Sequence, residues 1–483
     1  MFFKQRSKVI YRNYGAFGYI TDNRNFGYRL LNEDEHYIGD KIVSESGAIF
    51  LSILERKPQS IDIIVKKIHD FFPNVDIKTL LCDAKDFFFS LENEGFITSG
   101  ETPQECIEKD NCYSFKDLVL NNRQCHTKTH NDKEISSEEY FDRYYNGTPR
   151  LLSLHIEIVS KCNERCVHCY IPHENKNMVM EPQMFYDILK QGLSLKVLNI
   201  TISGGEPMIH RNFIDFLRKC NEYNFSVNIL SNLTLLNQDI IREIKNNPLI
   251  SIQTSLYSMD SDIHDNITKE KGSFFKTKSA ILNLIDNNIP VQISCPIMKQ
   301  NIDYYKDVVN WGKSQGINVN SDYVIIAKYN HSCQNLNCRL SLEEIHRIIL
   351  QNLVDNPKYI ESIKKTYNND TYLNDYLCRV CNSSICISEK GSIFPCAGWQ
   401  SYVIANIKEN SLNEIWSNNA KVNYLRNIRR KDIKDCVICK AKEFCIPCMV
   451  RNANESQSGN PLEANKFFCS IAHLYKKLHS ELK

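Results

Sequence analysis

The stretch LLSLHIEIVSKCNERCVHC, residues 151–169, decides the fold because an apolar run in it ends in three closely spaced cysteines. Residues 151–158 have the length and apolar content of a buried strand. Cys162, Cys166 and Cys169 follow on one short loop, separated by three and two residues. Three thiolates on a tight loop hold three irons of a cubane [4Fe–4S] cluster and leave the fourth iron open. A zinc loop and unliganded thiols are the alternatives.

After this stretch the chain alternates between strand-like and helical patterns. The expected strands are 151–158, 197–203, 226–230, 249–256, 291–298 and 319–326. The expected helices between them are 182–192, 213–221, 239–246, 274–286 and 304–312. Six such units with apolar strands predict an α/β fold, an open partial (β/α)6 barrel with helices outside. Active sites in these folds lie at the carboxyl ends of the strands, where the three cysteines fall.

The flanking regions differ from the barrel in composition. Residues 1–100 combine short strands with helical patterns at 47–55, 60–72 and 77–94 and a strand or wing at 95–97, which predicts a winged helix-turn-helix domain. Residues 101–148 are polar and predict a linker with one short helix. The barrel is assigned to 149–335 and a helical bridge to 336–377. Residues 378–483 are rich in cysteine and close with a helix at 463–482.

Composition narrows the functional class of the 483-residue chain. The formal net charge is +2, which gives no support for non-specific binding to nucleic acid. We expect neither a membrane helix nor a signal peptide, because the start of the chain has no long apolar run, and we expect a cytoplasmic location. Nine of the twenty cysteines lie between residues 378 and 469. In a reducing compartment such cysteines indicate metal ligands or reactive thiols rather than disulfides.

A second motif, TISGGEP at residues 201–207, ends the second expected strand. Paired glycines, Gly204 and Gly205, let a ligand approach the backbone closely. The carboxylate of Glu206 can accept hydrogen bonds from an ammonium group. One βα unit separates this turn from the cysteine loop.

Together the two motifs resemble the radical S-adenosylmethionine (SAM) superfamily. Cys162, Cys166 and Cys169 match its CxxxCxΦC loop with His168 as the aromatic residue, and Gly204, Gly205, Glu206 and Pro207 match its GGEP turn. The resemblance implies that SAM chelates the open iron through its amine and carboxylate. One electron from the cluster then cleaves SAM to methionine and a 5′-deoxyadenosyl radical, which takes a hydrogen atom from the substrate.

Three further matches to this superfamily are looser. Asn232, in the run SNLT after the third strand, resembles the "TNGT" segment, and Ser255 resembles a fourth-strand serine that contacts SAM. Lys269 lies near a position where relatives carry a basic partner for the SAM carboxylate. The alternatives are an ordinary strand serine for Ser255 and structural roles for Asn232 and Lys269.

The C-terminal cysteines resemble the SPASM extension of radical SAM peptide-modifying enzymes, which carries two auxiliary [4Fe–4S] clusters. The resemblance implies that the first is held by Cys378, Cys381, Cys396 and Cys448, and the second by Cys436, Cys439, Cys445 and Cys469. The chain departs from the pattern in one spacing, because two residues rather than three precede Cys448. A two-zinc ribbon is the alternative. An open iron in the first auxiliary cluster is also consistent with the sequence.

The other cysteines are interpreted without a ligand role. Cys82, Cys220, Cys295 and Cys386 fall in helix or strand patterns and are expected to be buried small side chains. Nothing is assigned to Cys106, Cys112, Cys125, Cys333 and Cys338, although the last two form a weak candidate metal pair.

The N-terminal unit resembles the PqqD-like recognition element of peptide-maturation enzymes. This resemblance implies that a leader peptide binds as an added strand between the sheet edge and the last helix. DNA binding is the alternative, but the expected recognition helix carries Asp83, Asp86, Glu92 and Glu94 against Lys78 and Lys85, the wrong sign for phosphate. A structural cap is a further alternative.

These parts occur together in maturases of ribosomally made peptides, so the sequence predicts a radical SAM peptide-modifying enzyme. The leading product is a thioether from a Cys sulfur to carbon, with carbon–carbon or ether crosslinks as alternatives. The expected partners are a precursor peptide and an electron donor such as flavodoxin or ferredoxin. Competing hypotheses are a sulfatase-type Ser/Cys oxidising maturase, a small-molecule radical dehydrogenase and a peptide-binding scaffold. Ala397 disfavours the first, because relatives of that kind carry Asp at this position.

Overall fold

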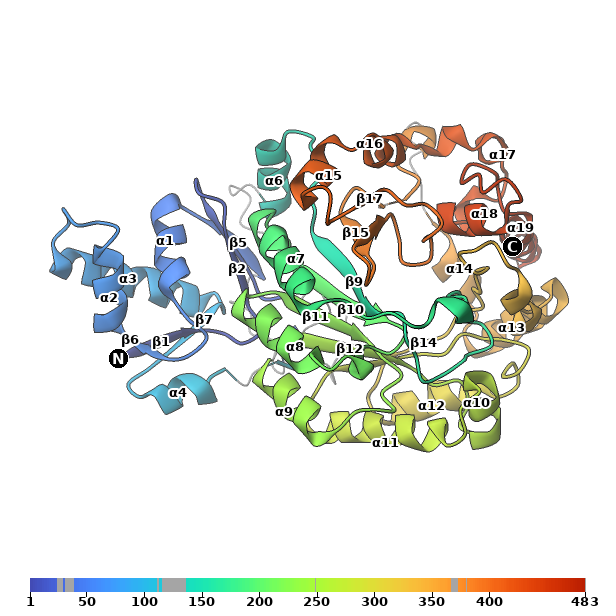
Figure 1. The fold of residues 1–483 in the computed structure, drawn as a ribbon, viewed down its shortest axis with the longest axis horizontal. Helices are drawn as coiled ribbons and strands as arrows, with labels where there is room; N and C mark the ends of the chain where they lie inside the picture. Colours follow the sequence, from blue (N-terminus) through green and yellow to red (C-terminus); the bar gives the residue numbers. More distant parts are fainter. Residues whose placement is uncertain are drawn as a thin grey trace.

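The computed structural model describes residues 1–482 apart from 24–28, 31–38, 111–112, 115–135, 248, 366–371 and 379. Figure 1 shows three parts, an N-terminal unit in blue, a central sheet with helices in green and yellow, and a C-terminal part in orange and red. Across the described ranges, no helix is both long and apolar enough to span a bilayer.

Among its described residues, the N-terminal unit contains two three-stranded antiparallel sheets that pack with helices α1 to α3. Strand β1 (Phe2–Gln5) lies between β6 (Gln59–Ser60) and β7 (Ile97–Gly100), and β3 (Gly18–Thr21) lies between β2 (Ile10–Asn13) and β5 (Asp40–Val43). Helices α1 (Glu45–Ile53), α2 (Ile61–His69) and α3 (Ile77–Asn93) confirm the three helical patterns. Side chains at their N-caps accept backbone N–H bonds, which explains where each helix begins. The strand expected at 95–97 is β7, and it pairs with the start of the chain.

The described ends of the segment expected as a linker are folded. Helix α4 (Pro103–Glu108) follows β7, and Asp110 forms a buried ion pair with Lys4 and accepts the Ser7 N–H at 2.9 Å. Helix α6 (Ser137–Tyr145) packs Phe141 against aromatic rings of the β2–β3 hairpin. Strand β8 (Tyr113–Ser114) lies between these two helices in the sequence, and it pairs with β4 (Arg29–Leu30). Cys112 and Cys125 lie outside the described residues.

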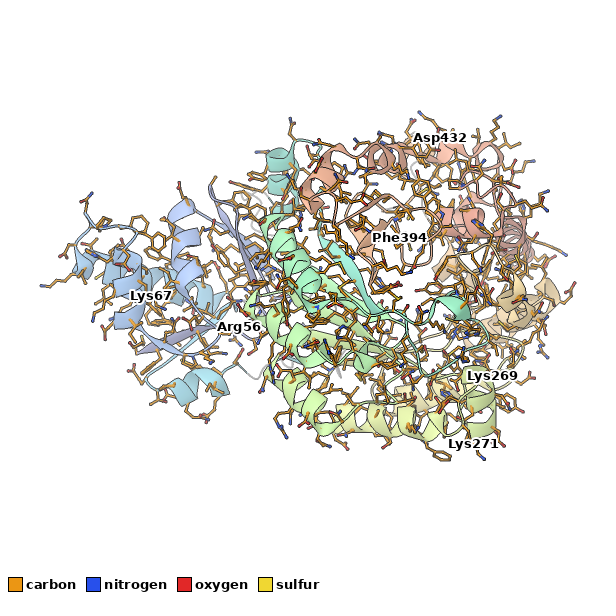
Figure 2. The ribbon with its side chains drawn as sticks, in the orientation of Figure 1. Arg56, Lys67, Lys269, Lys271, Phe394 and Asp432 are labelled. Carbon is orange, nitrogen blue, oxygen red and sulfur yellow. The ribbon has the colours of Figure 1, made fainter. Side chains whose placement is uncertain are left out.

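Two arginines tie the N-terminal unit to the central part. Arg12 is buried and donates to the carbonyls of Val197 and Asn224, each at 2.9 Å. Arg56 lies at the junction in Figure 2 and donates to the side chains of Asn221 and Asn224. Both guanidinium groups therefore donate charge-assisted hydrogen bonds to acceptors at the places where helices of the central part lead into its strands.

The central sheet confirms the predicted order of six parallel strands. In sequence and in space these are β9 (Ser153–Val159), β10 (Asn199–Gly204), β11 (Ser226–Leu230), β12 (Ile250–Ser255), β13 (Val291–Ser294) and β14 (Val319–Asn320). The helices are α7 (Pro182–Ser194), α8 (Phe213–Glu222), α9 (Gln238–Asn246), α10 (Ser261–Thr268), α11 (Ser273–Asp286) and α12 (Tyr305–Ser314). The last two strands end earlier than expected, and α10 was not predicted.

The two faces of this sheet differ in polarity. Side chains such as Ile156, Ile200 and Ile252 are buried in the core beneath the helices. Alternate residues on the opposite face are polar, among them His155, Thr201, Asn228, Ser251, Gln253, Gln292 and Ser294. Period-two alternation therefore leaves a polar inner face.

The cysteine-rich part continues the same sheet. Strand β15 (Ser384–Ile387) pairs parallel with β9, followed by β16 (Ser392–Phe394) and β17 (Ala405–Asn406) in antiparallel order. The bridge contains α13 (Leu342–Asp355) and α14 (Tyr359–Ile363). The remaining helices are α15 (Leu412–Asn418), α16 (Ala420–Asn427), α17 (Lys434–Val437), α18 (Met449–Glu455) and α19 (Lys466–Glu481).

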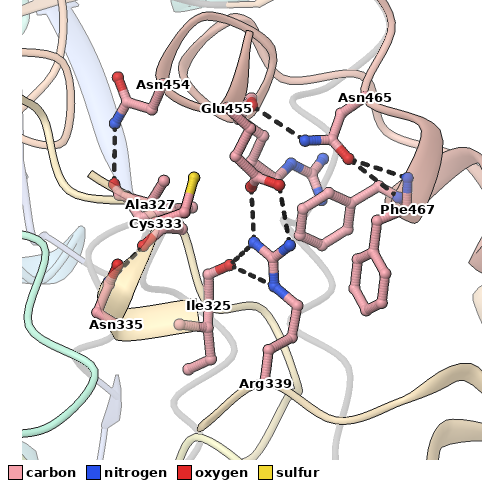
Figure 3. Close-up of polar contacts among 12 residues, drawn as sticks. Ile325, Ala327, Cys333, Asn335, Arg339, Asn454, Glu455, Asn465 and Phe467 are labelled. Carbon is pink, nitrogen blue, oxygen red and sulfur yellow. Dashed lines mark hydrogen bonds and ion pairs between the residues drawn. The ribbon is translucent and has the colours of Figure 1, made fainter. Parts of the chain in front are cut away.

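A buried ion pair joins the end of the barrel to this C-terminal part (Figure 3). Arg339 donates to Glu455 at 2.9 and 2.6 Å and to the carbonyl of Ile325 at 3.1 Å. Its guanidinium lies 4.6 Å from the ring centroid of Phe467. The side chains of Arg339 and Glu455 are only 8% and 14% exposed. Removing either one would therefore leave the charge of the other buried without its partner.

Candidate functional site

The loop with Cys162, Cys166 and Cys169 lies against the turn of Gly204 and Gly205. The Gly205 N–H donates to the carbonyl of Val159 at 2.7 Å, and the Glu206 N–H donates to that of Lys161 at 2.9 Å. These bonds fix the backbone that leads into Cys162. The second strand therefore positions the cysteine loop of the first.

The glycines are required by this contact between backbones. A Cβ on Gly204 would lie 1.9 Å from the carbonyl oxygen of Val159, and one on Gly205 would lie 2.2 Å from that of Lys161. Gly204 also has a φ of +131°, which disfavours other residues. The close approach of a ligand, expected from the sequence, stays a prediction, and the structure adds that the preceding backbone already leaves no room for a Cβ on either glycine.

The loop after the third strand makes the next set of bonds. The side-chain N–H of Asn232 donates to Asn163 of the cysteine loop at 2.9 Å, and Asn163 donates to Thr234 at 2.7 Å. The fully buried carboxylate of Glu206 accepts from the Asn232 N–H and from the Ser231 hydroxyl, each at 2.8 Å. It also accepts from the N–H of Met208 at 3.0 Å.

These bonds give Glu206 a structural role in addition to the one expected from the sequence. Its carboxylate is directed at protein donors from the same turn and the neighbouring loop, so it anchors the loop of Asn232 to the GGEP turn. Burial raises its pKa to about 7, and its hydrogen bonds oppose that rise. The expected acceptor of an ammonium group is thus already engaged by three protein donors.

A third side of the cysteine loop rests on α10 and α11. The N–H groups of Arg165 and Val167 donate to the carbonyls of Thr268 and Ile267 at 2.9 and 3.0 Å. Glu164 is buried and accepts a hydrogen bond from the hydroxyl of Ser273. Sequence reasoning missed these contacts, because they depend on where α10 packs, and no motif marks them.

The three thiols lie close enough for their charges to interact. Removal from water raises the pKa of Cys162 to about 11 and that of Cys166 well above its usual range, and the charges of Glu164, Cys169 and Cys162 add to the rise at Cys166. A bound metal offsets such shifts by holding thiolates. A set of three thiols on one fixed loop therefore fits a three-cysteine cluster site.

His168 and Ser255 lie on the same side of the sheet as the cysteine loop's neighbour Tyr257. The rings of His168 and Tyr257 are 5.2 Å apart, and their polar atoms are 3.4 Å apart. Nδ1 of His168 is buried without a hydrogen-bond partner in the described structure. Ser255 is the last residue of β12. Burial raises the pKa of Tyr257, and a side-chain hydrogen bond with Ser255 opposes that rise. An unpartnered buried nitrogen beside the loop fits a site that receives a polar ligand.

Lys269 follows α10 with a φ of +58° and is exposed (Figure 2). Its backbone lies next to Thr268, which bonds the cysteine loop. The structure therefore places it near the site without giving its side chain a contact there.

Several of the C-terminal cysteines lie close enough to influence one another's pKa. The thiols of Cys378 and Cys448 both raise the pKa of Cys396, and Cys378 raises that of Cys381. In the second group, the charges of Cys439, Cys445 and Cys469 raise the pKa of Cys436. Burial is the largest cause in each case. Every candidate auxiliary ligand therefore lies near other members of its own group.

The remaining cysteines give mixed outcomes. Cys220, Cys295 and Cys386 are buried as expected, but Cys82 is exposed on α3, so the expectation of a buried side chain there is wrong. The helical pattern has Cys82 beside the apolar stripe rather than on it. Of the cysteines to which nothing was assigned, Cys106 within α4 and Cys338 at the end of a 3-10 turn are buried, whereas Cys333 is exposed.

Comparison with protein families agrees with this geometry. Residues 156–312 match the radical SAM superfamily, and residues 378–441 match SPASM, an iron–sulfur cluster-binding domain. The chain contains a radical SAM domain followed by a SPASM domain. Those two domains imply SAM and iron–sulfur clusters, in agreement with the thiol groups described above.

Individual relatives extend the comparison. The chain is 24% identical over 332 residues to an AdoMet-dependent heme synthase of Methanosarcina barkeri, covering 63% of this chain and 92% of that protein. It is 28% identical over 162 residues to the subtilosin biosynthesis protein AlbA of Bacillus subtilis, covering 32% of this chain and 36% of AlbA. The structure of Streptococcus suis SuiB bound to precursor peptide SuiA matches with a TM-score of 0.58 and 15% identity, covering 97% and 99% of the two chains. At this identity, the likeness to SuiB shows a common fold, including the N-terminal part.

Proposed function

We propose that the chain is a radical SAM maturase that holds a ribosomally made precursor peptide by its leader and crosslinks the core segment. The main support is the cysteine loop, which the structure holds on three sides. The same chain also contains two further groups of cysteines and an N-terminal unit with an unpaired sheet edge. SuiB, whose printed description names a bound precursor peptide, has the same fold over 97% of this chain. Thioethers from Cys sulfur to carbon are the leading product, and carbon–carbon or ether links are the alternatives.

In this proposal Cys162, Cys166 and Cys169 hold the SAM-binding cluster. When bound, that cluster and SAM supply a carbon radical that removes a hydrogen atom from the substrate. Gly204, Gly205, Glu206 and Pro207 form the turn proposed to hold the amino group of SAM, and the N–H groups of Gly205 and Glu206 also orient the backbone before the cysteine loop. His168, Asn232 and Ser255 are the side chains proposed to contact SAM.

The two C-terminal groups are proposed to hold auxiliary clusters. Cys378, Cys381, Cys396 and Cys448 form one set, and Cys436, Cys439, Cys445 and Cys469 form the other. The grouping of their thiols supports this assignment. Cys448 lies directly before α18 and so reaches the first set although its spacing departs from the family pattern.

The leader-binding role is proposed for β5 and α3. β5 pairs with β3 on one side, and no strand of the described chain pairs with its other side. A Cβ on Gly47 would lie 3.1 Å from the ring of Phe87 and 3.2 Å from Val43, so β5 ends close to α3. Lys41 on β5 and Glu94 after α3 also form an ion pair. An unpaired edge beside the last helix suits a peptide that adds a strand.

Proline substitution along β5 tests the leader-binding role. Backbone N–H groups alternate along an antiparallel strand, so one of Lys41 and Ile42 directs its N–H to the free edge and the other to β3. We expect one of the Lys41→Pro and Ile42→Pro variants to fold normally and to bind a fluorescent leader peptide at least tenfold more weakly. Full binding by both variants would exclude β5 as the docking strand.

An acidic electron donor is proposed to dock beside the second auxiliary set. A hollow of about 800 Å³ is lined by Cys439, Cys469 and His473, together with one acid, Asp435, and four lysines, Lys440, Lys466, Lys476 and Lys477. Ile438 on its rim is 83% exposed. A basic rim around two cysteines attracts an acidic partner and raises its rate of encounter.

Charge reversal tests this docking surface. The Lys466→Glu/Lys476→Glu variant should accept electrons from reduced flavodoxin at least tenfold more slowly at low salt, and the difference should shrink as salt rises. Lys276→Glu/Lys313→Glu, on α11 and α12, is the matched control and should react normally. Equal rates for both variants would contradict docking at this hollow.

Formation of 5′-deoxyadenosine separates the enzyme from a peptide-binding scaffold. We expect 5′-deoxyadenosine when the reconstituted protein is incubated anaerobically with SAM and dithionite, and Cys166→Ala should abolish it. Absence of the product from the wild-type protein with full iron content would refute an enzymatic role. A sulfatase-type activity is disfavoured by Ala397, and an aldehyde product on Ser or Cys of the peptide would reveal it.

A further inference from the structure

Three metal-binding side chains outside the two auxiliary sets and the cysteine loop converge on the inner face of the sheet. His155 and Glu157 lie on β9, and Cys386 lies on the neighbouring β15, where it pairs in register with His155. One ligand atom from each of the three lies within 4.8 Å of the others. Glu157 and Cys386 are 3% and 1% exposed, so the group is interior.

The carboxyl group of Glu157 is only partly satisfied. Its Oε2 accepts from Gln400 Nε2 at 2.5 Å, whereas Oε1 is buried without a hydrogen-bond partner of normal geometry. The phenol of Tyr170 lies within reach of a side-chain hydrogen bond that lowers the pKa of this carboxyl, but burial raises it to about 8. A buried oxygen without a partner is costly unless a ligand satisfies it.

The groups around this site are acidic, so they repel one another when they are charged. Glu389, which is 8% exposed, lies three residues after Cys386 in the turn between β15 and β16. A thiol, a carboxyl and a second carboxyl are therefore gathered in a region of low polarity. A divalent cation would satisfy Oε1 of Glu157 and offset this accumulation of acidic groups.

We propose that His155, Glu157 and Cys386 form a mononuclear site for a divalent metal ion, with zinc as the preferred ion. Imidazole, carboxylate and thiolate are all common zinc ligands, and a mixed set of one each is better suited to zinc than to calcium or magnesium. Three protein ligands leave one position of a tetrahedral zinc ion for water or another ligand.

Outer contacts of the kind that orient metal ligands are already in place. Gln400 holds one oxygen of Glu157 and leaves the other available, and the hydroxyl of Ser203 shares a hydrogen bond with Nε2 of His155. Such partners fix the direction of a ligand and tune its affinity for the metal. Simple packing of three unrelated side chains would not require Glu157 Oε1 to be left without a bond.

The site lies between the two regions assigned to clusters. His155 and Glu157 lie on β9, the strand that leads into the cysteine loop, and Cys386 lies in the sequence between Cys381 and Cys396 of the first auxiliary set. A metal ion here would therefore be separate from the cluster ligands but close to both groups.

Zinc stoichiometry tests the site without measuring activity. Full-length protein with reconstituted clusters is supplied anaerobically with one equivalent of zinc, washed with a chelator and analysed for zinc, iron and sulfide. We expect about one zinc per chain, falling below about a fifth of that in Glu157→Gln and Cys386→Ser at unchanged iron content. Gln400→Ala should weaken zinc binding by about 10- to 100-fold. Cys220→Ser, which changes a buried thiol on α8, is the control and should retain the zinc.

X-ray absorption at the zinc edge of the wild-type protein identifies the ligands even if a variant fails to fold. We expect one sulfur at about 2.3 Å and otherwise nitrogen or oxygen at about 2.0–2.1 Å. A shell of sulfur alone would place the zinc on cluster cysteines and overturn the proposal. Zinc that is lost to the chelator, or equally retained by the Glu157→Gln and Cys386→Ser variants, would also overturn it.

Discussion

Substitution of Gly205 by alanine is the sharpest test of how the cysteine loop is positioned. The new Cβ would lie 2.2 Å from the carbonyl oxygen of Lys161 and 2.5 Å from that of Ser160. Both are backbone atoms, so no rotamer change relieves the contact. The turn and the loop must therefore separate by roughly 1 Å, a displacement that costs about 10²-fold in rate when it moves reacting groups.

The same displacement weakens two backbone hydrogen bonds. The Gly205 N–H to Val159 and the Glu206 N–H to Lys161 are 2.7 and 2.9 Å long, and each contributes about 1 kcal/mol. We expect Gly205→Ala to form 5′-deoxyadenosine at least tenfold more slowly. Iron held by the three-cysteine loop should fall, as measured by iron analysis and by the electron paramagnetic resonance signal of the reduced cluster with SAM.

The matched control is Gly192→Ala on α7. Its Cβ would meet the tip of the Leu154 side chain at 3.1 Å, a contact that a rotamer shift relieves. This variant should keep its rate within about twofold. If Gly205→Ala also keeps its iron and its rate within that range, the GGEP turn does not position the cysteine loop and the reasoning fails.

Three further predictions concern stability. Arg339→Ala leaves Glu455 buried without its partner and should lower the free energy of unfolding, measured by chemical denaturation, by about 3–5 kcal/mol. The control is Arg242→Ala, which removes the ion pair with Asp239, whose side chains are 72% and 71% exposed. It should change the free energy of unfolding by less than about 1 kcal/mol. Phe141→Ala removes a ring that packs on the β2–β3 hairpin and should cost about 3–5 kcal/mol; unchanged hydrogen exchange in that hairpin would contradict this. Glu206 keeps its proton up to pH about 7 in the fold but only to about 4.5 when unfolded, so its contribution to stability is present below pH 4.5 and is lost as pH rises to about 7. Glu206→Gln should remove that part of the pH dependence of the melting temperature, and an identical profile would count against the raised pKa.

Much of the central sheet could be predicted because its signals are local. Apolar runs with turns between them placed β9 to β12 to within about two residues, and cysteine spacing marked the loop after β9. The strand expected to end at 326 ends at Asn320 instead, since it pairs only with the short β13 and an apolar run alone does not fix where pairing stops.

The site was harder to predict where it depends on contacts between distant segments. Nothing local shows that Ser273 bonds Glu164, or that Cys386 lies beside His155 through the pairing of β15 with β9. The paired glycines stand out in the sequence, but nothing local shows that the carbonyl groups of Val159 and Lys161 lie against them. Spacing therefore identifies which residues matter, and the tertiary structure decides what each one touches.

Mass spectrometry of the precursor peptide tests the central claim most directly. The protein is co-expressed anaerobically with a candidate precursor, a short cysteine-containing peptide to be sought in the reading frames beside its gene, and the peptide is recovered and treated with iodoacetamide. We predict a loss of two hydrogens for each link and cysteines that resist alkylation, both absent with Cys166→Ala. An unmodified peptide in the presence of wild-type protein that forms 5′-deoxyadenosine would contradict the assignment as a peptide maturase.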